Sequence, residues 1–237
     1  MSKGVPVKSK IVASRHDAIA GLESGHSLLV GGWGGIGVPQ RLILAAVQTA
    51  ARNLTIVSNN CGMGQAGDVG ELFRAGMVGK AIVTFPTSPK AVEFRKRYDA
   101  NEVEVEVVPQ GTLAERLRAA GAGIGGFFTP TGAGTPLAEG RETRVIEGRE
   151  QLFETALRGD FAFIRVHQAD AMGNARFRLA GRGFNPLMAG AAKVTVVEAD
   201  EIVPVGSIAP DDVHLSGVFV DRVLGPEEIG SVEEGVE

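Results

Sequence analysis

The fold is decided by Leu28-Leu29-Val30-Gly31-Gly32-Trp33-Gly34-Gly35-Ile36-Gly37-Val38-Pro39. This stretch begins with an apolar run that ends in two glycines, which is typical of a buried strand leaving a sheet. Residues 40–47 follow with apolar side chains one turn apart, as in a helix. Pro39 is expected at the first helical position, where its fixed φ suits the helix and its missing N–H costs nothing. The stretch therefore predicts a strand, a glycine loop and a helix in succession.

The glycine loop is also the first candidate for a binding site. Its five glycines, between residues 31 and 37, allow left-handed backbone angles and remove the Cβ atoms that would keep a ligand away. Backbone N–H groups in such a turn, just before a helix, attract phosphates, carboxylates and oxyanions. We therefore expect an anionic or polar ligand at this loop.

Composition excludes several classes of protein. The chain has 237 residues, of which 44% are apolar, so it can bury a core as one domain. A net charge of −4, the lack of a dense Lys/Arg cluster and an aromatic content of 5% argue against nucleic-acid binding. No apolar run reaches the ~18 residues of a membrane span. With Cys61 as the only cysteine and no signal-peptide core, we expect a cytoplasmic protein.

Strands and helices alternate along the first half of the chain. Strands are expected at Ser27–Gly31, Leu54–Ser58, Lys80–Phe85 and Glu102–Val108, each followed by a loop and a helix. Thr112 and Glu115 predict a capping box at the start of the fourth helix. This order predicts an α/β fold with an open, mostly parallel sheet and helices on both faces. The loops leaving the carboxyl ends of parallel strands share one edge, where ligands bind. These are Gly31–Gly37, Asn59–Gly64, Pro86–Pro89 and Pro109–Thr112.

The second half of the chain is less regular. We expect an ordered loop over residues 121–134, a helix at Leu152–Leu157 between two strands, and a helix that begins at Asn185. Residues 1–225 are interpreted as a single domain. Residues 226–237 contain five glutamates and little apolar content, and they are expected to form an acidic, flexible tail.

A dinucleotide site is one alternative for the glycine loop. Gly32-x-Gly34-x-x-Gly37 has the spacing of the dinucleotide-binding fingerprint. Such a site also needs an acidic residue about 20 positions further on, to hold the ribose hydroxyls. Here Ser58, Asn59 and Asn60 stand there, and no carboxylate follows before Asp68. A nicotinamide- or flavin-dependent oxidoreductase, and a loop that is glycine-rich only for packing, both remain open.

Three amide side chains join the glycine loop at the same predicted edge. Asn59, Asn60 and Gln110 could be ordinary turn residues. Beside backbone N–H groups, however, uncharged amides suit a carboxylate or a thioester carbonyl that becomes an oxyanion. The four histidines are scattered without ligand spacing, so no metal site is expected. Cys61 is interpreted as a buried thiol rather than a nucleophile.

Several motifs together resemble one family. The glycine stretch resembles the first signature of the A (alpha) subunit of class I CoA-transferases of the 3-oxoacid type. The other motifs resemble that family in the same order, and the likeness runs from about Asp17 to Leu224. They are Ser58-Asn59-Asn60, Val108-Pro109-Gln110-Gly111-Thr112-Leu113-Ala114-Glu115-Arg116, Gly121-Ala122-Gly123, Phe128-Thr129-Pro130-Thr131-Gly132, Phe184-Asn185-Pro186 and Val220-Asp221-Arg222-Val223. This sequence departs from the family at Trp33, where the signature has Phe, at Ser24, and in the loop after Asn60.

The resemblance implies transfer of coenzyme A between two carboxylic acids. In the family, a glutamate from the B subunit first attacks the acyl-CoA and later carries coenzyme A as a glutamyl thioester. This chain has no such glutamate motif, so the resemblance implies half an enzyme that needs a B subunit, in a heterodimer or heterotetramer.

The resemblance also assigns the site. It implies that the loop contacts coenzyme A, as a co-substrate rather than a permanent cofactor, through Gly31, Gly32, Trp33, Gly34, Gly35, Ile36 and Gly37. Asn59, Asn60 and Gln110 are expected to line the acyl pocket. The acids exchanged stay open: acetoacetate, 3-oxoadipate and short fatty acids all fit. A non-catalytic acyl-ligand-binding protein on a related scaffold is a further alternative.

Overall fold

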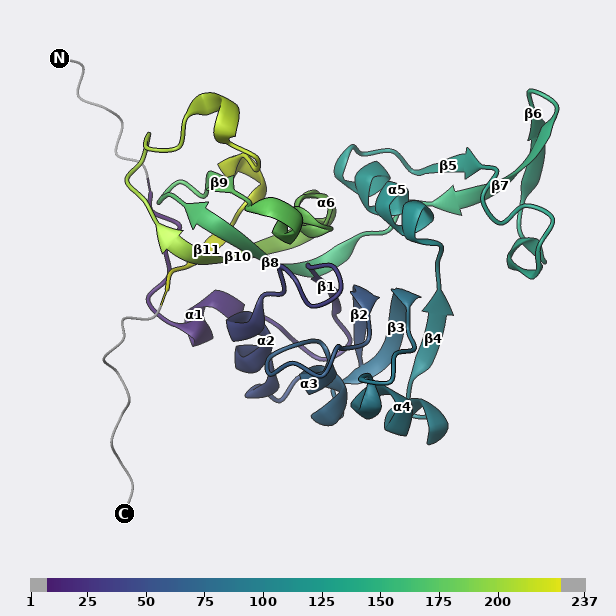
Figure 1. The fold of residues 1–237 in the computed structure, drawn as a ribbon, viewed down its shortest axis with the longest axis horizontal. Coiled ribbons are helices and arrows are strands. Elements are labelled where there is room, and N and C mark those ends of the chain that lie inside the picture. Colours follow the sequence, from purple (N-terminus) through teal and green to yellow (C-terminus); the bar gives the residue numbers. More distant parts are fainter. Residues whose placement is uncertain (1–7, 227–237) are drawn as a thin grey trace.

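The computed structural model describes residues 8–226 and is built around one large sheet (Figure 1). The order of strands across this sheet is β11-β10-β8-β1-β2-β3-β4, and β9 pairs with β8 beside it. All these pairs are parallel except β8 with β9. The predicted open, mostly parallel sheet is therefore confirmed. Its strands are β1 (Ser27–Val30), β2 (Leu54–Asn60), β3 (Val78–Phe85), β4 (Glu104–Val107), β8 (Gly159–Ala169), β9 (Ala175–Arg176), β10 (Ala192–Ile202) and β11 (Arg222–Leu224).

Helices cover both faces of the sheet, as predicted. Figure 1 shows α1 to α4 on one side and α5 and α6 on the other. Neighbouring residues of β1 divide between the two cores, because successive side chains of a strand point to opposite faces: Leu28 packs with the first set of helices and Leu29 with the second. The helices are α1 (Arg15–Ile19), α2 (Gln40–Val47), α3 (Gly70–Arg74), α4 (Val92–Asp99), α5 (Gln110–Gly121) and α6 (Asn185–Ala191), with short 3₁₀ turns η1 (Pro136–Ala138), η2 (Leu179–Arg182), η3 (Pro210–Asp212) and η4 (Gly217–Phe219).

A small antiparallel sheet extends away from the main one (Figure 1). It consists of β5 (Gly126–Thr129), β7 (Arg149–Thr155) and β6 (Thr143–Ile146), in the order β5-β7-β6. The helix predicted at Leu152–Leu157 is wrong, because these residues begin inside β7. Leu152 and Glu154 are buried on one side of that strand, and Arg141 pairs with the Glu154 carboxylate at 2.6 Å. Pairing with two neighbouring strands overrides the local helix preference. The loop predicted over residues 121–134 also contains a strand, β5.

Two predicted boundaries change at the sheet edge. Helix α5 starts at Gln110 rather than after Thr112, so the predicted capping box is absent. The first helical bond runs from the N–H of Leu113 to the carbonyl of Pro109 at 2.9 Å, and the buried Thr112 hydroxyl has no hydrogen-bond partner within residues 8–226. Pro39 directly precedes α2 instead of occupying its first position.

Strand β2 runs on to Asn60, two residues beyond the predicted end. Asn59 and Asn60 therefore belong to the strand and not to the loop that follows it. The interpretation of residues 1–225 as one domain stays a prediction, and residues 227–237 of the expected acidic tail lie outside the described part of the chain. Within residues 8–226, no helix has the length and apolar character needed to cross a membrane.

Candidate active site

The tip of the glycine loop is a tight hairpin. Trp33 and Ile36 exchange two backbone hydrogen bonds, of 2.9 and 3.0 Å, around a turn made by Gly34 and Gly35. Gly34 has φ +62°, in the left-handed region, and a Cβ atom added to it would meet nothing within 4 Å. Glycine is required at this position by the backbone angle and not by crowding.

Other glycines of the loop are set by close contacts within the protein. A Cβ atom on Gly31 would overlap the side chain of Asn185, and one on Gly37 would lie 2.5 Å from the carbonyl oxygen of Gly181. A Cβ atom on Gly35 would lie 2.6 Å from the side-chain amide of Gln65, but that amide is the flexible end of an exposed side chain and can move aside. Packing therefore explains much of the glycine content that the sequence analysis ascribed to ligand access.

Asn59 and Asn60 hold the hairpin at Gly34. The N–H of Gly34 donates to the Oδ1 atom of Asn59 at 3.1 Å, and the Nδ2 group of Asn60 donates to the carbonyl of Gly34 at 2.9 Å. Both asparagines are buried at the end of β2. Asn59 also donates to the Thr84 hydroxyl at 2.8 Å, and Asn60 accepts the N–H of Gly62 at 2.8 Å. The structure thus joins these two residues to the loop, with most of their polar atoms engaged in holding it.

Gln110 lies beside the same hairpin. As the first residue of α5 it is exposed, and its side chain has no hydrogen-bond partner within residues 8–226. It lines a cavity of about 240 Å³ together with Trp33, Gly111, Ala114, Gly183, Phe184 and Leu187. The Gln110 amide is therefore free to meet a ligand next to the hairpin.

Fewer N–H groups of the loop are open to a ligand than the sequence predicts. Those of Trp33 and Ile36 bond within the hairpin, that of Gly34 bonds to Asn59, and that of Gly31 bonds to the carbonyl of Phe163 at 2.9 Å. Within the described chain, no acceptor is hydrogen-bonded to the N–H groups of Gly32, Gly35 and Gly37. These three N–H groups are the ones left for an oxyanion or a phosphate.

Asn185 supports the loop and was missed as a site residue by sequence reasoning. Its Nδ2 group donates to the carbonyl of Gly37 at 3.0 Å and to that of Gly181 at 2.8 Å, while its Oδ1 atom accepts the N–H of Arg165 at 3.1 Å. It is fully buried at the start of α6. The Phe184-Asn185-Pro186 motif was visible in the sequence, but nothing there indicates that its amide reaches a loop 148 residues earlier.

Glu198 supports the helix that follows the loop. Its buried carboxylate accepts the N–H groups of Arg41 and Leu42 at 2.8 and 3.1 Å, so it caps the start of α2 from strand β10. Burial raises the pKa of Glu198 above its usual range, although the guanidinium of Arg41, 3.5 Å away, acts in the opposite direction. The sequence contains no local signal for this cap, because its two parts are 157 residues apart.

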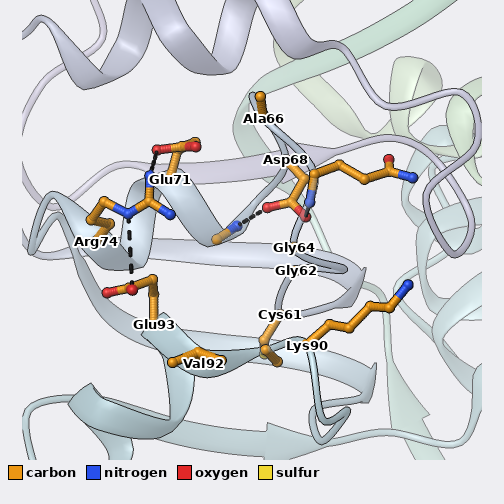
Figure 2. A pocket seen from close by; sticks show the side chains of 13 residues that line it. Cys61, Gly62, Gly64, Ala66, Asp68, Glu71, Arg74, Lys90, Val92 and Glu93 are labelled. Carbon is orange, nitrogen blue, oxygen red and sulfur yellow. Dashed lines mark hydrogen bonds and ion pairs between the residues drawn. The ribbon is translucent and has the colours of Figure 1, made fainter.

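A larger cavity, of about 450 Å³, opens next to the hairpin. It lies between the loop after β2, helix α3 and the start of α4, as Figure 2 shows. Cys61 lines it but is itself buried, and burial raises the pKa of its thiol to about 12. A thiol with that pKa is protonated at neutral pH and is a poor nucleophile.

Two alternative chemistries lack support at this site. A dinucleotide site wants a carboxylate at the end of the second strand, but there the structure has Asn59 and Asn60, bonded to Gly34. A metal site needs a cluster of ligands, and no group of three His, Cys, Asp or Glu side chains suited to a metal occurs within residues 8–226.

Comparison with known proteins identifies the family. The coenzyme A transferase family model matches residues 12–225. The A subunit of the 3-oxoadipate CoA-transferase of Pseudomonas putida is 45% identical over 91% of this chain and 93% of its own length. The probable A subunit of a succinyl-CoA:3-ketoacid coenzyme A transferase, from Bacillus subtilis, is 42% identical over 95% of this chain and 94% of its own.

A solved structure agrees on the fold. The acyl-CoA transferase YdiF of Escherichia coli O157:H7 superposes with a TM-score of 0.78 at 23% identity, over 92% of this chain. This chain spans only 47% of YdiF, about half of that protein's length. The family match over nearly the whole chain confirms the resemblance seen in the motifs. The chain belongs to the coenzyme A transferase family, as the A subunit of a heteromeric CoA-transferase.

Proposed function

We propose that this chain and a B subunit together move coenzyme A between an acyl-CoA and a 3-oxoacid or short-chain carboxylic acid. The two relatives carry names that contain a 3-oxoacid, and both names include a dicarboxylic acid, as 3-oxoadipate or as succinyl-CoA. Identity above 40% over almost the entire chain supports the same reaction type here. It does not by itself select the acid pair.

The observation that carries the proposal is the set of uncharged donors around the Gly34 hairpin. The free amide of Gln110 and the unpaired N–H groups of Gly32, Gly35 and Gly37, in the part of the chain that the structure describes, suit a thioester carbonyl whose oxygen gains negative charge during attack. In this proposal the loop from Gly31 to Gly37 contacts coenzyme A and Gln110 contacts the acyl group. Asn59 and Asn60 line the acyl pocket and keep the Gly34 peptide in one orientation before substrate arrives.

The nucleophile is proposed to come from the partner. The cavity that contains Gln110 and the hollow around Gly34 have no glutamate among their described lining residues. Large apolar side chains are exposed around the loop: Trp33 is 49% exposed, Ile36 52% and Leu179 87%. Such a surface suits burial against a B subunit, which would bring its glutamate to the hairpin.

The proposed reaction has two covalent stages. The partner's glutamate attacks the thioester carbonyl, and the carbon–sulfur bond breaks to release the coenzyme A thiolate and form an acyl-glutamyl anhydride. The thiolate then attacks the glutamyl carbonyl, which releases the first acid and leaves a glutamyl-CoA thioester. The second acid reverses these steps and leaves as a new acyl-CoA.

The test is to trap the thioester and locate it. The complex is incubated with acyl-CoA without an acceptor acid and treated with borohydride, which reduces a glutamyl thioester to an alcohol. The mass change is expected on the partner, with the mass of this chain unaltered. A modified glutamate or cysteine on this chain, or full turnover by this chain alone, would overturn the proposal.

A further inference from the structure

The cavity of Figure 2 has its charged groups at two ends. At one end Arg74 pairs with Glu71 at 2.8 Å and with Glu93 at 3.9 Å, and Lys96 also pairs with Glu93 at 3.2 Å. These four charges cancel. Lys90 extends in the opposite direction, and Figure 2 shows its ammonium group at the far end of the cavity from Arg74.

The negative charge of Asp68 in the cavity is already satisfied by backbone N–H groups. The buried carboxylate of Asp68 accepts the N–H groups of Met63 at 2.6 Å, Gln65 at 3.0 Å and Gly70 at 2.7 Å. These bonds fix the backbone of the loop that follows β2. The Asp68 carboxylate therefore stabilises the loop backbone and is not a counter-ion for Lys90.

The backbone of Lys90 is held in place, while its exposed side chain has no partner for its charge within residues 8–226. The hydroxyl of Ser88 accepts the N–H of Lys90 at 3.0 Å, and the carbonyl of Ser88 accepts that of Ala91 at 3.0 Å. A Cβ atom added to Gly64 would lie 3.5 Å from the Cβ of Lys90, so the two loops are in contact. Within residues 8–226, the ammonium group makes no ion pair and no hydrogen bond.

Gln65, the residue after Gly64, connects Lys90 to the hairpin. The Gln65 amide lies across Gly35, where an added Cβ would be 2.6 Å from both Nε2 and Oε1. The amide has no hydrogen-bond partner in the described chain, although three bonds to Asp68 fix the loop that carries it. The exposed amide of Gln65, carried by a fixed backbone, and the exposed, unpaired ammonium group of Lys90 thus line one cavity beside the Gly34 hairpin.

We propose that Lys90 and Gln65 bind the second carboxylate of a dicarboxylic acyl group, and so select dicarboxylic over monocarboxylic acids. The inference rests on the proposed function. A dicarboxylic acid places one carboxyl group at the reacting centre and keeps a free carboxylate at the other end of its carbon chain. An ammonium ion and an amide N–H supply donors for the two oxygens of that carboxylate. A monocarboxylic acid of equal length places a methyl group there and gains nothing from Lys90.

The test compares acids that differ only in the second carboxylate. The complete A–B complex is assayed with succinate against butyrate, and with 3-oxoadipate against 3-oxohexanoate, using acetoacetyl-CoA as the common donor. The variants are Lys90→Met, which keeps the stem and removes the charge, Lys90→Arg, which keeps the charge, and Gln65→Leu. Lys96→Met is the matched control, because it removes a lysine charge from the same helix region at an exposed surface pair.

The wild-type complex is expected to prefer the dicarboxylic member of each pair. Lys90→Met should lower kcat/KM for the dicarboxylic acids ~10–100-fold, the size of a lost charged hydrogen bond. The monocarboxylic values should stay within about threefold. Lys90→Arg should restore much of the loss, Gln65→Leu should show a smaller loss of the same kind, and Lys96→Met should change neither class.

Three results would overturn the inference while leaving the transferase in place. One is a wild type that prefers the monocarboxylic acids, and another is a Lys90→Met complex with unchanged selectivity. The third is a Lys90→Met complex whose KM for the CoA ester rises by the same factor with every acid. That result would assign Lys90 to a phosphate of coenzyme A. A wild-type complex that transfers coenzyme A to none of these acids would instead contradict the proposed function.

Discussion

The side-chain oxygen of Asn59 accepts a hydrogen bond from the backbone N–H of Gly34 at 3.1 Å, and Asn60 donates to the carbonyl of the same glycine at 2.9 Å. Two successive residues at the end of β2 therefore form hydrogen bonds with the N–H and C=O groups of one loop residue. These two bonds fix the direction in which the hairpin presents its other N–H groups. An anion site built this way needs little rearrangement when charge develops.

Gly34→Val should remove activity without preventing folding. A β-branched residue is strongly disfavoured at φ +62°, but its Cβ would meet no atom within 4 Å. We expect turnover of the complex to fall at least ~100-fold, through distortion of the hairpin. Gly123→Val is the control, since Gly123 has φ +74° and equally open surroundings after α5. Similar falls in Tm for the two variants, with activity lost only for Gly34→Val, would support the proposed role. An active Gly34→Val complex would show that the loop is glycine-rich only for packing.

Gln110→Ala should lower kcat with little change in stability. The side chain has no hydrogen-bond partner in the described chain, so its loss leaves no buried group unpaired. Loss of one donor aimed at developing charge typically lowers turnover ~10²–10³-fold. Steady-state kinetics and thermal melting of the complex measure the two effects, with Gln151→Ala on β7 as the control. Kinetics within a few-fold of wild type would show that Gln110 does not contact the reacting group.

Cys61 should resist alkylation in the folded chain. Burial raises the pKa of its thiol to about 12, so the thiolate that reacts with iodoacetamide is scarce at a mildly alkaline pH. Mass spectrometry should find the native chain unmodified and the chain unfolded in guanidinium modified once. Rapid alkylation of the native chain under the same conditions would contradict the buried, protonated thiol.

Asp160 should stabilise the centre of the sheet in a pH-dependent way. Burial raises the pKa of its carboxyl group, but hydrogen bonds from Lys193 at 2.7 Å and from Ser27 at 2.8 Å outweigh this and hold the pKa below its usual range. The stabilisation is therefore full above the unfolded-state pKa, near ~3.9, and is lost as the pH falls through the folded-state value. Asp160→Ala should be less stable than wild type at neutral pH.

The measurement is the difference in free energy of unfolding between wild type and Asp160→Ala, from denaturant titrations between about pH 7 and about pH 3. The difference should stay constant down to about pH 5 and then shrink. Asp17→Ala is a control, because Asp17 is an exposed residue whose carboxylate accepts the hydroxyl of its neighbour Ser14. A difference for Asp160→Ala that grows as the pH falls would show that the carboxylate is not stabilised by these bonds.

The sequence by itself determined the alternation of strands and helices in the first half of the chain. Alternating strands and helices, glycines at the end of β1 and a run of motifs from Asp17 to Leu224 were enough to predict a parallel α/β fold and the family. Local chemistry also places α2 at Gln40–Val47, one residue after the predicted start at Pro39. These features are local because hydrophobic periodicity and turn residues act over a few neighbouring positions.

Only the tertiary structure decided which residues meet. The segment from Arg149 to Thr155 is a strand because β5 and β6 lie on either side of it. Asn59 and Asn60 are bonded to Gly34 because β1 and β2 are neighbours in the sheet, and Gly31 has no room for a Cβ atom because the buried Asn185 lies against it. Asn185 and Glu198 reach the loop and helix α2 from 148 and 157 residues away in the sequence. Such contacts depend on long-range packing and burial, which no local pattern of side chains encodes.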